Sequence, residues 1–245
     1  MILKNKTILV TGVGKGIGKA ILLNALKNGA FVYGITRSKT DLMPYKKIKN
    51  IKIFHGDLTK SSDVKKIFKH AKKHNHNITG LVNNAGIRFR KKFLQISKID
   101  LQNVFENNFF SAFLTTQAFL NFSKKNCKLS IVNIGSIVGK LGFSELSAYA
   151  SSKAALNALS KCIAAESISN KLRINTINPG FIKTSYFKKF KKDKKKLYEW
   201  TISRTPIGRW GEAEEVANLA IFLLSSNSEY INGEDISIDG GWSNA

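Results

Sequence analysis

Short apolar runs alternate with longer helical patterns along the whole chain, and this alternation limits the fold more than any other feature. We expect strands at Thr7–Thr11, Ala30–Ile35, Ile51–His55, Gly80–Asn83, Ser130–Ile134, Arg173–Asn178 and Asp235–Asp239. We expect helices at Gly16–Lys27, Ser61–His74, Leu101–Ser123, Ala148–Ser169 and Ala213–Leu224. Continuously apolar strands are covered on both faces, and their alternation with helices builds βαβ units. The sequence therefore predicts an α/β fold, a doubly wound parallel sheet of about seven strands with helices on both faces.

Length and composition favour one domain. The 245 residues contain three scattered prolines and no linker rich in proline or serine, so we expect a single domain over residues 1–245. No apolar run approaches the roughly 18 residues of a membrane helix, and the first residues lack a signal-peptide pattern. Two cysteines without a CxxC spacing suit a reducing compartment, and we expect a cytoplasmic protein with no membrane partner.

The formal charge of +24 raises the possibility of nucleic-acid binding. Between Asp63 and Lys73, however, the apolar side chains form one helical stripe and the lysines take the opposite face. We therefore read the charge as solvated surface and treat nucleic-acid binding as a distant alternative. The run Lys188–Lys196 holds seven lysines and is expected to be exposed and mobile.

A glycine-rich turn follows the first expected strand. Thr11 leads into Gly12-Val13-Gly14-Lys15-Gly16-Ile17-Gly18, and a helical pattern begins at once. Glycines allow a tight turn close to a pyrophosphate, which the free N–H groups of a helix N-terminus can bind. The general GxGxxG pattern fails in the register that starts at Gly12, because Ile17 takes the last glycine position. Taken alone, the turn favours a phosphate site no more than a structural turn.

The spacing of this turn, TGxxxGIG, is more specific, and it resembles the cofactor turn of the classical short-chain dehydrogenases/reductases. That family has about this chain length and a Rossmann-like fold, and the resemblance extends from Thr7 to Gly241. It implies that the turn binds a nicotinamide cofactor through Gly12, Lys15, Gly16, Ile17 and Gly18.

The end of the second strand bears on which nicotinamide cofactor is used. An acid there would bind the adenosine ribose and favour NAD, but Thr36 is followed by Arg37. Arg37 and Lys15 suit a 2′-phosphate, and in the family basic residues at these places mark NADP preference. The alternative is ordinary surface charge in a very basic chain. We expect NADP(H) rather than NAD(H).

Two further motifs follow the third and fourth strands. The resemblance implies that Asp57 and Leu58 lie against the adenine. The NNAG motif matches one that both braces the sheet and lines the cofactor, through Asn83, Ala85 and Gly86. Asn and Gly also suit tight turns, so a purely structural role is the alternative.

Tyr149 and Lys153 carry the most informative chemistry. Four residues apart on a helix, they share one face. A free tyrosine has a pKa near ~10, and a neighbouring ammonium favours the phenolate and lowers that pKa. Such a pair can exchange a proton with a substrate oxygen near neutral pH. The resemblance gives Tyr149 the role of general acid/base, and it gives Lys153 contacts with the cofactor ribose.

Three more matches accompany this pair. Ser136 ends the fifth strand, where a hydroxyl can stabilise charge that develops on a carbonyl oxygen. Asn108 matches the asparagine of the family's NxxxxF helix, which holds a water in a proton relay. Gly135 stands where many members carry serine. The PGxxxT motif implies that the nicotinamide is held by residues that follow the sixth strand, namely Pro179, Gly180, Ile182 and Thr184.

The resemblance thus implies an NAD(P)-dependent alcohol dehydrogenase or carbonyl reductase without a metal, whose catalytic residues are Asn108, Ser136, Tyr149 and Lys153. His70, His74 and His76 lie at a lysine-rich helix end without an acid or cysteine, so we expect solvated histidines rather than a zinc site. A non-catalytic NADPH sensor or scaffold is a further distant alternative.

Substrate choice is expected in residues 185–204, which the family uses as a lid and which hold Tyr186, Phe187 and Phe190 among lysines. The glycine turn and the stretch after the fifth strand resemble 3-oxoacyl-(acyl carrier protein) reductases, and a basic rim suits an acidic carrier protein. The pair Glu199-Trp200 and the segment Arg204–Gly211 resemble gluconate 5-dehydrogenases and other sugar-acid or polyol members instead. We favour the acyl-carrier-bound substrate. The resemblance also implies a homotetramer packed through the Leu101 and Ala148 helices and the last strand.

Overall fold

Seven parallel strands form the centre of the molecule. The structure is a computed structural model, and it describes residues 1–45, 48–124, 126–166, 171–185 and 187–244. Their spatial order is β3-β2-β1-β4-β5-β6-β9, and every neighbouring pair is parallel. This arrangement confirms the doubly wound sheet. The strands are β1 (Thr7–Thr11), β2 (Phe31–Thr36), β3 (Ile51–His55), β4 (Ile78–Asn83), β5 (Leu129–Ile134), β6 (Leu172–Pro179) and β9 (Asp235–Ile238).

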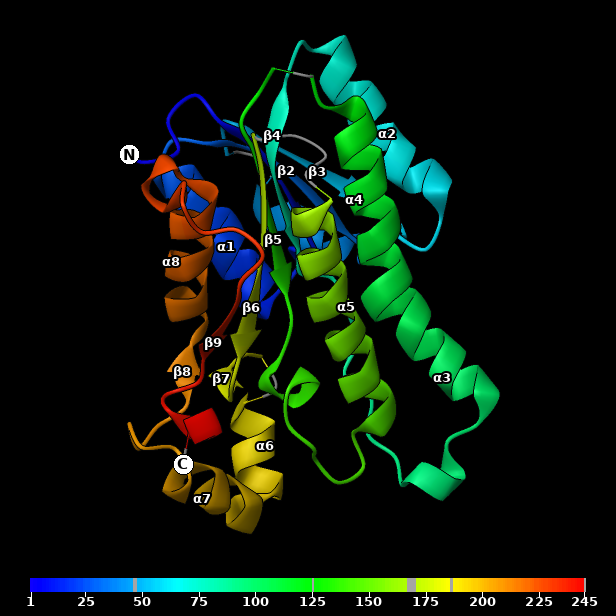
Figure 1. Ribbon diagram of the computed structural model, residues 1–245, viewed down its shortest axis with the longest axis vertical. Helices are drawn as coiled ribbons and strands as arrows, with labels where there is room; N and C mark the ends of the chain where they lie inside the picture. Colours follow the sequence, from blue (N-terminus) through cyan, green and yellow to red (C-terminus); the bar gives the residue numbers. More distant parts are fainter. Residues whose placement is uncertain (46–47, 125, 167–170, 186, 245) are drawn as a thin grey trace.

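Helices cover both faces of the sheet (Figure 1). On one face α1 (Gly16–Lys27) and α8 (Ala213–Leu224) pack on a core that includes Val10 and Val132. On the other face α2 (Ser61–Lys73), α4 (Ser111–Phe122) and α5 (Ser147–Ala165) enclose a second core. The strands are buried from both sides, which explains why their sequences are apolar without alternation.

The sheet reverses its order between β1 and β4, because the chain winds to β2 and β3 on one side and to β5 and β6 on the other. Ligands of doubly wound folds bind at such a switch point, beyond the carboxyl ends of the strands. The glycine-rich turn follows β1 at this edge, and the NNAG motif follows β4. Thr11 joins the two, since its Oγ1 accepts hydrogen bonds from the backbone N–H groups of Asn84 at 2.9 Å and Ala85 at 3.0 Å.

The helix predicted at Leu101–Ser123 has two α-helical parts. The first part, α3 (Lys98–Phe105), starts at a capping box between Ser97 and Asp100. A π-helical turn, η3 (Glu106–Phe110), connects it to α4. The hydrophobic pattern could not indicate this turn, because one extra residue in a helix leaves the apolar spacing on either side intact.

The lysine-rich run is exposed, as predicted, and it is helical. It spans α6 (Phe187–Asp193) and the start of α7 (Lys195–Ser203). Phe190 is buried against Trp210, with ring centroids 5.1 Å apart, while the lysines of the run are exposed. One apolar side chain per turn is enough to fix a short helix on a packed surface.

Short elements complete the described residues. A two-stranded parallel sheet pairs β7 (Ile182–Lys183) with β8 (Gly211–Glu212). No helix among these residues is long and apolar enough to span a bilayer. Residues 167–169 of the predicted Ala148–Ser169 helix and Tyr186 lie outside the described residues. The 3-10 helices are η1 (Thr40–Tyr45), η2 (Phe93–Gln95), η4 (Ile137–Gly139), η5 (Ser226–Ser228) and η6 (Trp242–Asn244).

Two of the histidines that were expected to be solvated pack against the sheet. The hydroxyl of the buried Tyr33 lies 3.2 Å from Nδ1 of His70 and 2.8 Å from Nδ1 of His76. His74 is exposed and stacks on His70 with ring centroids 4.0 Å apart. Among the described residues no group of histidine, cysteine or acidic side chains has the arrangement of a metal site.

Candidate active site

Three predicted catalytic side chains line the same cavity. Tyr149 and Lys153 project from the first turns of α5, and Ser136 follows β5 as the N-cap of η4. The Lys153 ammonium lies 5.9 Å from the centre of the Tyr149 ring and donates a 2.7 Å hydrogen bond to the carbonyl oxygen of Ile134. The helical spacing of four residues thus places phenol and amine together, and the end of β5 adds the hydroxyl.

The surroundings of these groups shift their pKa values. Burial lowers the pKa of the Lys153 amine from 10.5 to about 8. Burial also raises the pKa of the Tyr149 phenol, whereas its hydrogen bond with Ser136 and the positive charge of Arg88 lower that pKa. Arg88 follows the NNAG motif by two residues, and sequence reasoning missed it because nothing in its spacing marks it as a site residue.

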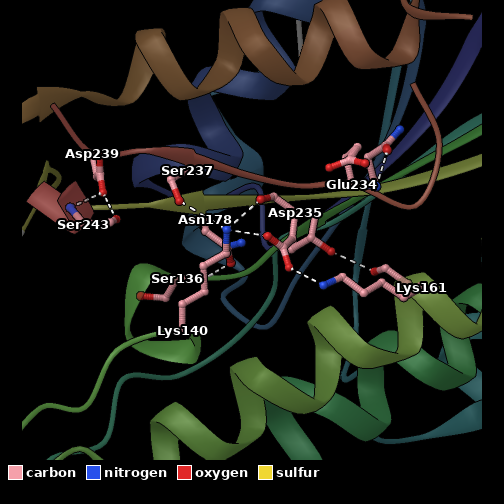
Figure 2. A network of polar contacts seen from close by, with 12 residues as sticks. Ser136, Lys140, Lys161, Asn178, Glu234, Asp235, Ser237, Asp239 and Ser243 are labelled. Carbon is pink, nitrogen blue, oxygen red and sulfur yellow. Dashed lines mark hydrogen bonds and ion pairs between the residues drawn. The ribbon is translucent and has the colours of Figure 1, made fainter. Parts of the chain in front are cut away.

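Ser136 is positioned by the neighbouring strand (Figure 2). Its backbone N–H donates a 3.0 Å hydrogen bond to Oδ1 of Asn178, a fully buried residue of β6. A Cβ atom at Gly135 would overlap that same oxygen and also lie close to Thr176. The Asn178 amide thus fills the space that a side chain at position 135 would need.

Asn108 lies in the π-helical turn and is completely buried. Its Oδ1 accepts a 2.7 Å hydrogen bond from the Ile87 N–H, and its Nδ2 donates to the Ile87 carbonyl and to Ser152 Oγ, both at 3.0 Å. The amide therefore fastens the loop after β4 to α5, the helix that carries Tyr149 and Lys153. Its side chain faces protein rather than the cavity.

The cavity in front of Tyr149 has a volume of about 560 Å³, and aromatic side chains form part of its wall. Trp210 is the centre of this wall, with ring centroids 5.3 Å from Phe181, 5.1 Å from Phe187 and 5.6 Å from Tyr198. Its indole N–H donates a 2.7 Å hydrogen bond to the Thr201 hydroxyl of α7. The apolar residues that line the cavity from the lid and from the adjoining loops include Phe143, Phe181, Phe190, Leu197, Trp200 and Trp210.

A second groove, of about 830 Å³, runs along the carboxyl edge from β3 to the loop after β7. The N-terminus of α1 opens into it: the N-cap residue Lys15 makes no capping hydrogen bond, which leaves the first N–H groups of the helix for a ligand. Gly12 and Gly16 have φ angles of 70° and 54°, and a side chain at Gly12 would overlap Ala85. These features fit a dinucleotide with its pyrophosphate on the helix end.

Most predicted cofactor residues line one of the two cavities. The groove receives Gly12, Lys15, Gly16, Ile17, Arg37, Asp57, Leu58, Ala85, Gly86 and Thr184. Tyr149, Lys153, Pro179, Gly180 and Ile182 line the cavity in front of the phenol.

Two predicted cofactor residues lie behind these walls instead. Asn83 is buried and donates to Thr116 Oγ1 at 2.9 Å and to Asn133 Oδ1 at 2.8 Å, so it braces β4 against α4 and β5. Gly18 is buried under the turn, where a side chain would overlap the Gly12 carbonyl. Asn84, which sequence reasoning did not select, lines both cavities.

A basic groove of about 720 Å³ continues from the aromatic cavity toward solvent. Arg88, Arg90, Phe190 and Leu197 line both spaces. Lys91, Lys92 and Lys194 add further cations. Glu145 pairs with Arg90 at 2.6 Å, and Asp100 pairs with Lys91 at 2.6 Å, so the described acids offset only part of this charge.

Known proteins are similar to this chain over nearly its whole length. A family model described as enoyl-(acyl carrier protein) reductase matches residues 12–243. The 2-dehydro-3-deoxy-D-gluconate 5-dehydrogenase of Bacillus subtilis is 34% identical over 248 residues, which cover 98% of this chain and 95% of that protein. This chain belongs to the short-chain dehydrogenase/reductase family. It is therefore an NAD(P)-dependent short-chain oxidoreductase.

Other short-chain dehydrogenases/reductases are about equally similar. The 3-oxoacyl-[acyl-carrier-protein] reductase of Thermotoga maritima is 34% identical over 248 residues, which cover 98% of this chain and 99% of that protein. A solved 4-hydroxyisoleucine dehydrogenase complexed with NADH has a TM-score of 0.91 at 28% identity and covers 98% of this chain and 99% of its own. Relatives with such different substrates show the fold and the class of reaction, and the substrate has to be argued from the cavity.

Proposed function

We propose that the protein is an NADP(H)-dependent oxidoreductase that interconverts a ketone and a secondary alcohol, and that its substrate is a 3-oxoacyl thioester on acyl carrier protein. One observation carries the chemistry: Tyr149, Ser136 and Lys153 meet at one wall of the aromatic cavity, beside the groove that fits a dinucleotide. The proposal treats residues 1–245 as one domain in which residues 185–204 form the substrate lid.

The nicotinamide, when bound, supplies or accepts the hydride. In the direction of reduction, the Tyr149 phenol gives its proton to the carbonyl oxygen, and the Ser136 hydroxyl donates a hydrogen bond to that oxygen as charge develops. The hydrogen bond with Ser136 and the charge of Arg88 hold the phenol pKa below the value that burial alone would give. Lys153 binds the cofactor ribose, and Asn108 acts as a positioning residue through Ile87 and Ser152.

The side chains that line the cavity support the proposal of an acyl thioester as substrate. Aromatic side chains from the lid contact an apolar acyl chain without leaving polar groups unpaired, whereas a polyhydroxy acid would lose hydrogen bonds to water there. The basic groove beyond the cavity suits the phosphate of a phosphopantetheine arm and an acidic carrier protein. The cofactor preference rests on Lys15 and Arg37, which both line the dinucleotide groove.

A second candidate is a sugar-acid or polyol dehydrogenase. Arg88 favours it, because its guanidinium lines the cavity beside Tyr149 and could pair with a substrate carboxylate. The name of the Bacillus subtilis relative is that of such an enzyme.

We further propose a cytoplasmic homotetramer. Apolar side chains are exposed on the outer surface of α3, the π-helical turn and α4, where Ile99 is 78% and Phe110 44% exposed. Neighbouring Leu101 and Phe113 extend this surface. An exposed patch of this kind suits burial against another copy of the chain.

The test is NADPH oxidation with an acetoacetyl thioester of acyl carrier protein and, in parallel, with 5-ketogluconate. We expect the thioester to be the better substrate. Tyr149→Phe should lower kcat by about 10²- to 10⁴-fold without weakening NADPH binding. Tyr230→Phe, which removes the hydroxyl of a fully exposed tyrosine, should leave the rate unchanged.

The outcomes separate the parts of the proposal. Faster turnover of 5-ketogluconate would replace the substrate with the second candidate. A Tyr149→Phe enzyme with the wild-type rate would contradict the proton-transfer role. Turnover of neither substrate, with NADPH still bound, would contradict both substrate proposals.

A further inference from the structure

The end of β2 has an acidic neighbour that arrives from further along the chain. Asp41 lies in η1, five residues after Thr36, and its Oδ2 accepts a 2.7 Å hydrogen bond from the Thr36 hydroxyl. The same carboxylate packs directly on Gly14 in the glycine-rich turn, where any side chain would overlap it. Asp41 is half-buried and lines the dinucleotide groove together with Lys15 and Arg37.

The segment that carries Asp41 is fastened to the turn. Tyr45, at the other end of η1, is buried, and its hydroxyl donates a 3.3 Å hydrogen bond to the Val13 carbonyl. The Asp41 backbone N–H donates to the Ser38 carbonyl at 3.3 Å. The helix η1 is therefore held at both ends. Its Asp41 carboxylate lies between Thr36, the last residue of β2, and Gly14, in the middle of the glycine-rich turn.

Folds of this type read the adenosine ribose at that place, where an acid bonds the 2′-hydroxyl and a cation accommodates a 2′-phosphate. We propose that Asp41 is a specificity-determining residue that binds the ribose hydroxyls of NAD(H) and opposes the 2′-phosphate of NADP(H). This inference rests on the proposed dinucleotide site and qualifies its NADP preference. The charges that face the 2′-position are then two cations and one carboxylate.

The two cations and the carboxylate differ in their exposure to solvent. Arg37 is exposed, and its guanidinium donates a 2.8 Å hydrogen bond to Oδ1 of Asn107 in the π-helical turn. Lys15 is also exposed. The Asp41 carboxylate, in contrast, is half-buried between the Thr36 hydroxyl and Gly14. A carboxylate in this position accepts hydroxyl groups at little cost of ordering, whereas a 2′-phosphate meets it as a like charge.

The experiment titrates the cofactor-free protein with NADPH and with NADH and follows the fluorescence of the bound nicotinamide. Asp41→Asn removes the charge and keeps an oxygen that accepts from Thr36. We expect the ratio of the two dissociation constants to move about tenfold toward NADPH, with tighter NADPH and weaker NADH binding. Asp193→Asn is the matched control, because it removes the same charge from the exposed surface of α6, and it should leave both constants unchanged.

A second variant separates recognition from support. Thr36→Val leaves the carboxylate but removes the hydroxyl that holds it, and NADH binding should weaken more than NADPH binding. If Asp41→Asn weakens both cofactors equally, Asp41 only supports the turn, and the inference is wrong. A shift of the ratio toward NADH would also overturn it.

The same titration distinguishes this inference from the proposed cofactor preference. A wild-type protein that binds NADH more tightly, with a ratio that Asp41→Asn moves toward NADPH, would contradict the preference and support the role of Asp41. If the wild type prefers NADPH and Asp41→Asn leaves that preference unchanged, the result supports the proposed cofactor preference and contradicts the role of Asp41.

Discussion

Replacing Lys153 by methionine should make the cofactor-free protein more stable at neutral pH, although it removes a proposed catalytic group. Lys153 is only 5% exposed, and burial lowers its pKa from 10.5 to about 8. At about 1.4 kcal/mol per pKa unit, keeping the ammonium charged inside the fold costs about 3 kcal/mol. The lost hydrogen bond to the Ile134 carbonyl offsets about 1 kcal/mol. We therefore expect the free energy of unfolding to rise by about 2 kcal/mol.

The pH dependence gives this prediction its sign. At pH 7 both the folded and the unfolded chain hold the proton, so the full cost is present. Between about pH 8 and pH 10.5 the unfolded chain keeps the proton and the folded chain loses it, so the wild type gains stability relative to Lys153→Met. The advantage of the variant should therefore be largest at pH 7 and should shrink above pH 8.

The assay is equilibrium unfolding in urea, followed by tryptophan fluorescence, between pH 7 and pH 9.5. Lys161→Met is the control on the same helix, because Lys161 is exposed and pairs with Asp235 at 2.9 Å. That variant should be slightly less stable than the wild type. If Lys153→Met unfolds at a lower urea concentration than the wild type at pH 7, or if the difference does not narrow above pH 8, the reasoning is refuted.

Two further predictions concern titrating groups outside this pair. The positive charge of Arg88 lowers the pKa of Tyr149, so in Arg88→Gln the rise of the alcohol oxidation rate with pH should move to higher pH. Arg90→Gln should leave this pH–rate profile unchanged. If both variants keep the wild-type profile, the role of Arg88 is contradicted. Burial, followed by the charges of His74 and Lys52, lowers the pKa of His70 below 6.5. The unfolding temperature should therefore fall as the pH drops below 6.5. His70→Asn should reduce that fall, and His55→Gln should leave it unchanged. If the unfolding temperature of His70→Asn falls as much as that of the wild type, this role of His70 is contradicted.

The sheet could be predicted because each of its strands carries its own signal. Seven short apolar runs appear in the sequence, and the structure moves their ends by two residues or fewer. The lid was harder. Its helix α6 packs through Phe190 on Trp210, and α7 packs on the same ring through Tyr198. Trp210 lies beyond both helices in the chain, and no local pattern encodes these contacts.

The candidate site was predictable where its groups share one element or follow a strand. Tyr149 and Lys153 are one helical turn apart, so spacing alone places them together. Asp41 was missed because its place against Gly14 depends on the path of η1, which brings a residue from beyond β2 back to its end. The sequence could not show that Asn83 braces the sheet rather than contacting the cofactor, because residues with either role occur at the end of the same strand.

The contact between Gly135 and Asn178 also limits how this sequence can change over time. A serine at position 135 would overlap the amide that holds Ser136, and loss of that amide would leave the Ser136 N–H without its acceptor. Neither single change is neutral, because each disturbs the contact that holds the Ser136 backbone. Position 135 can therefore accept a side chain only if residue 178 changes with it, so replacing either residue alone should weaken the site.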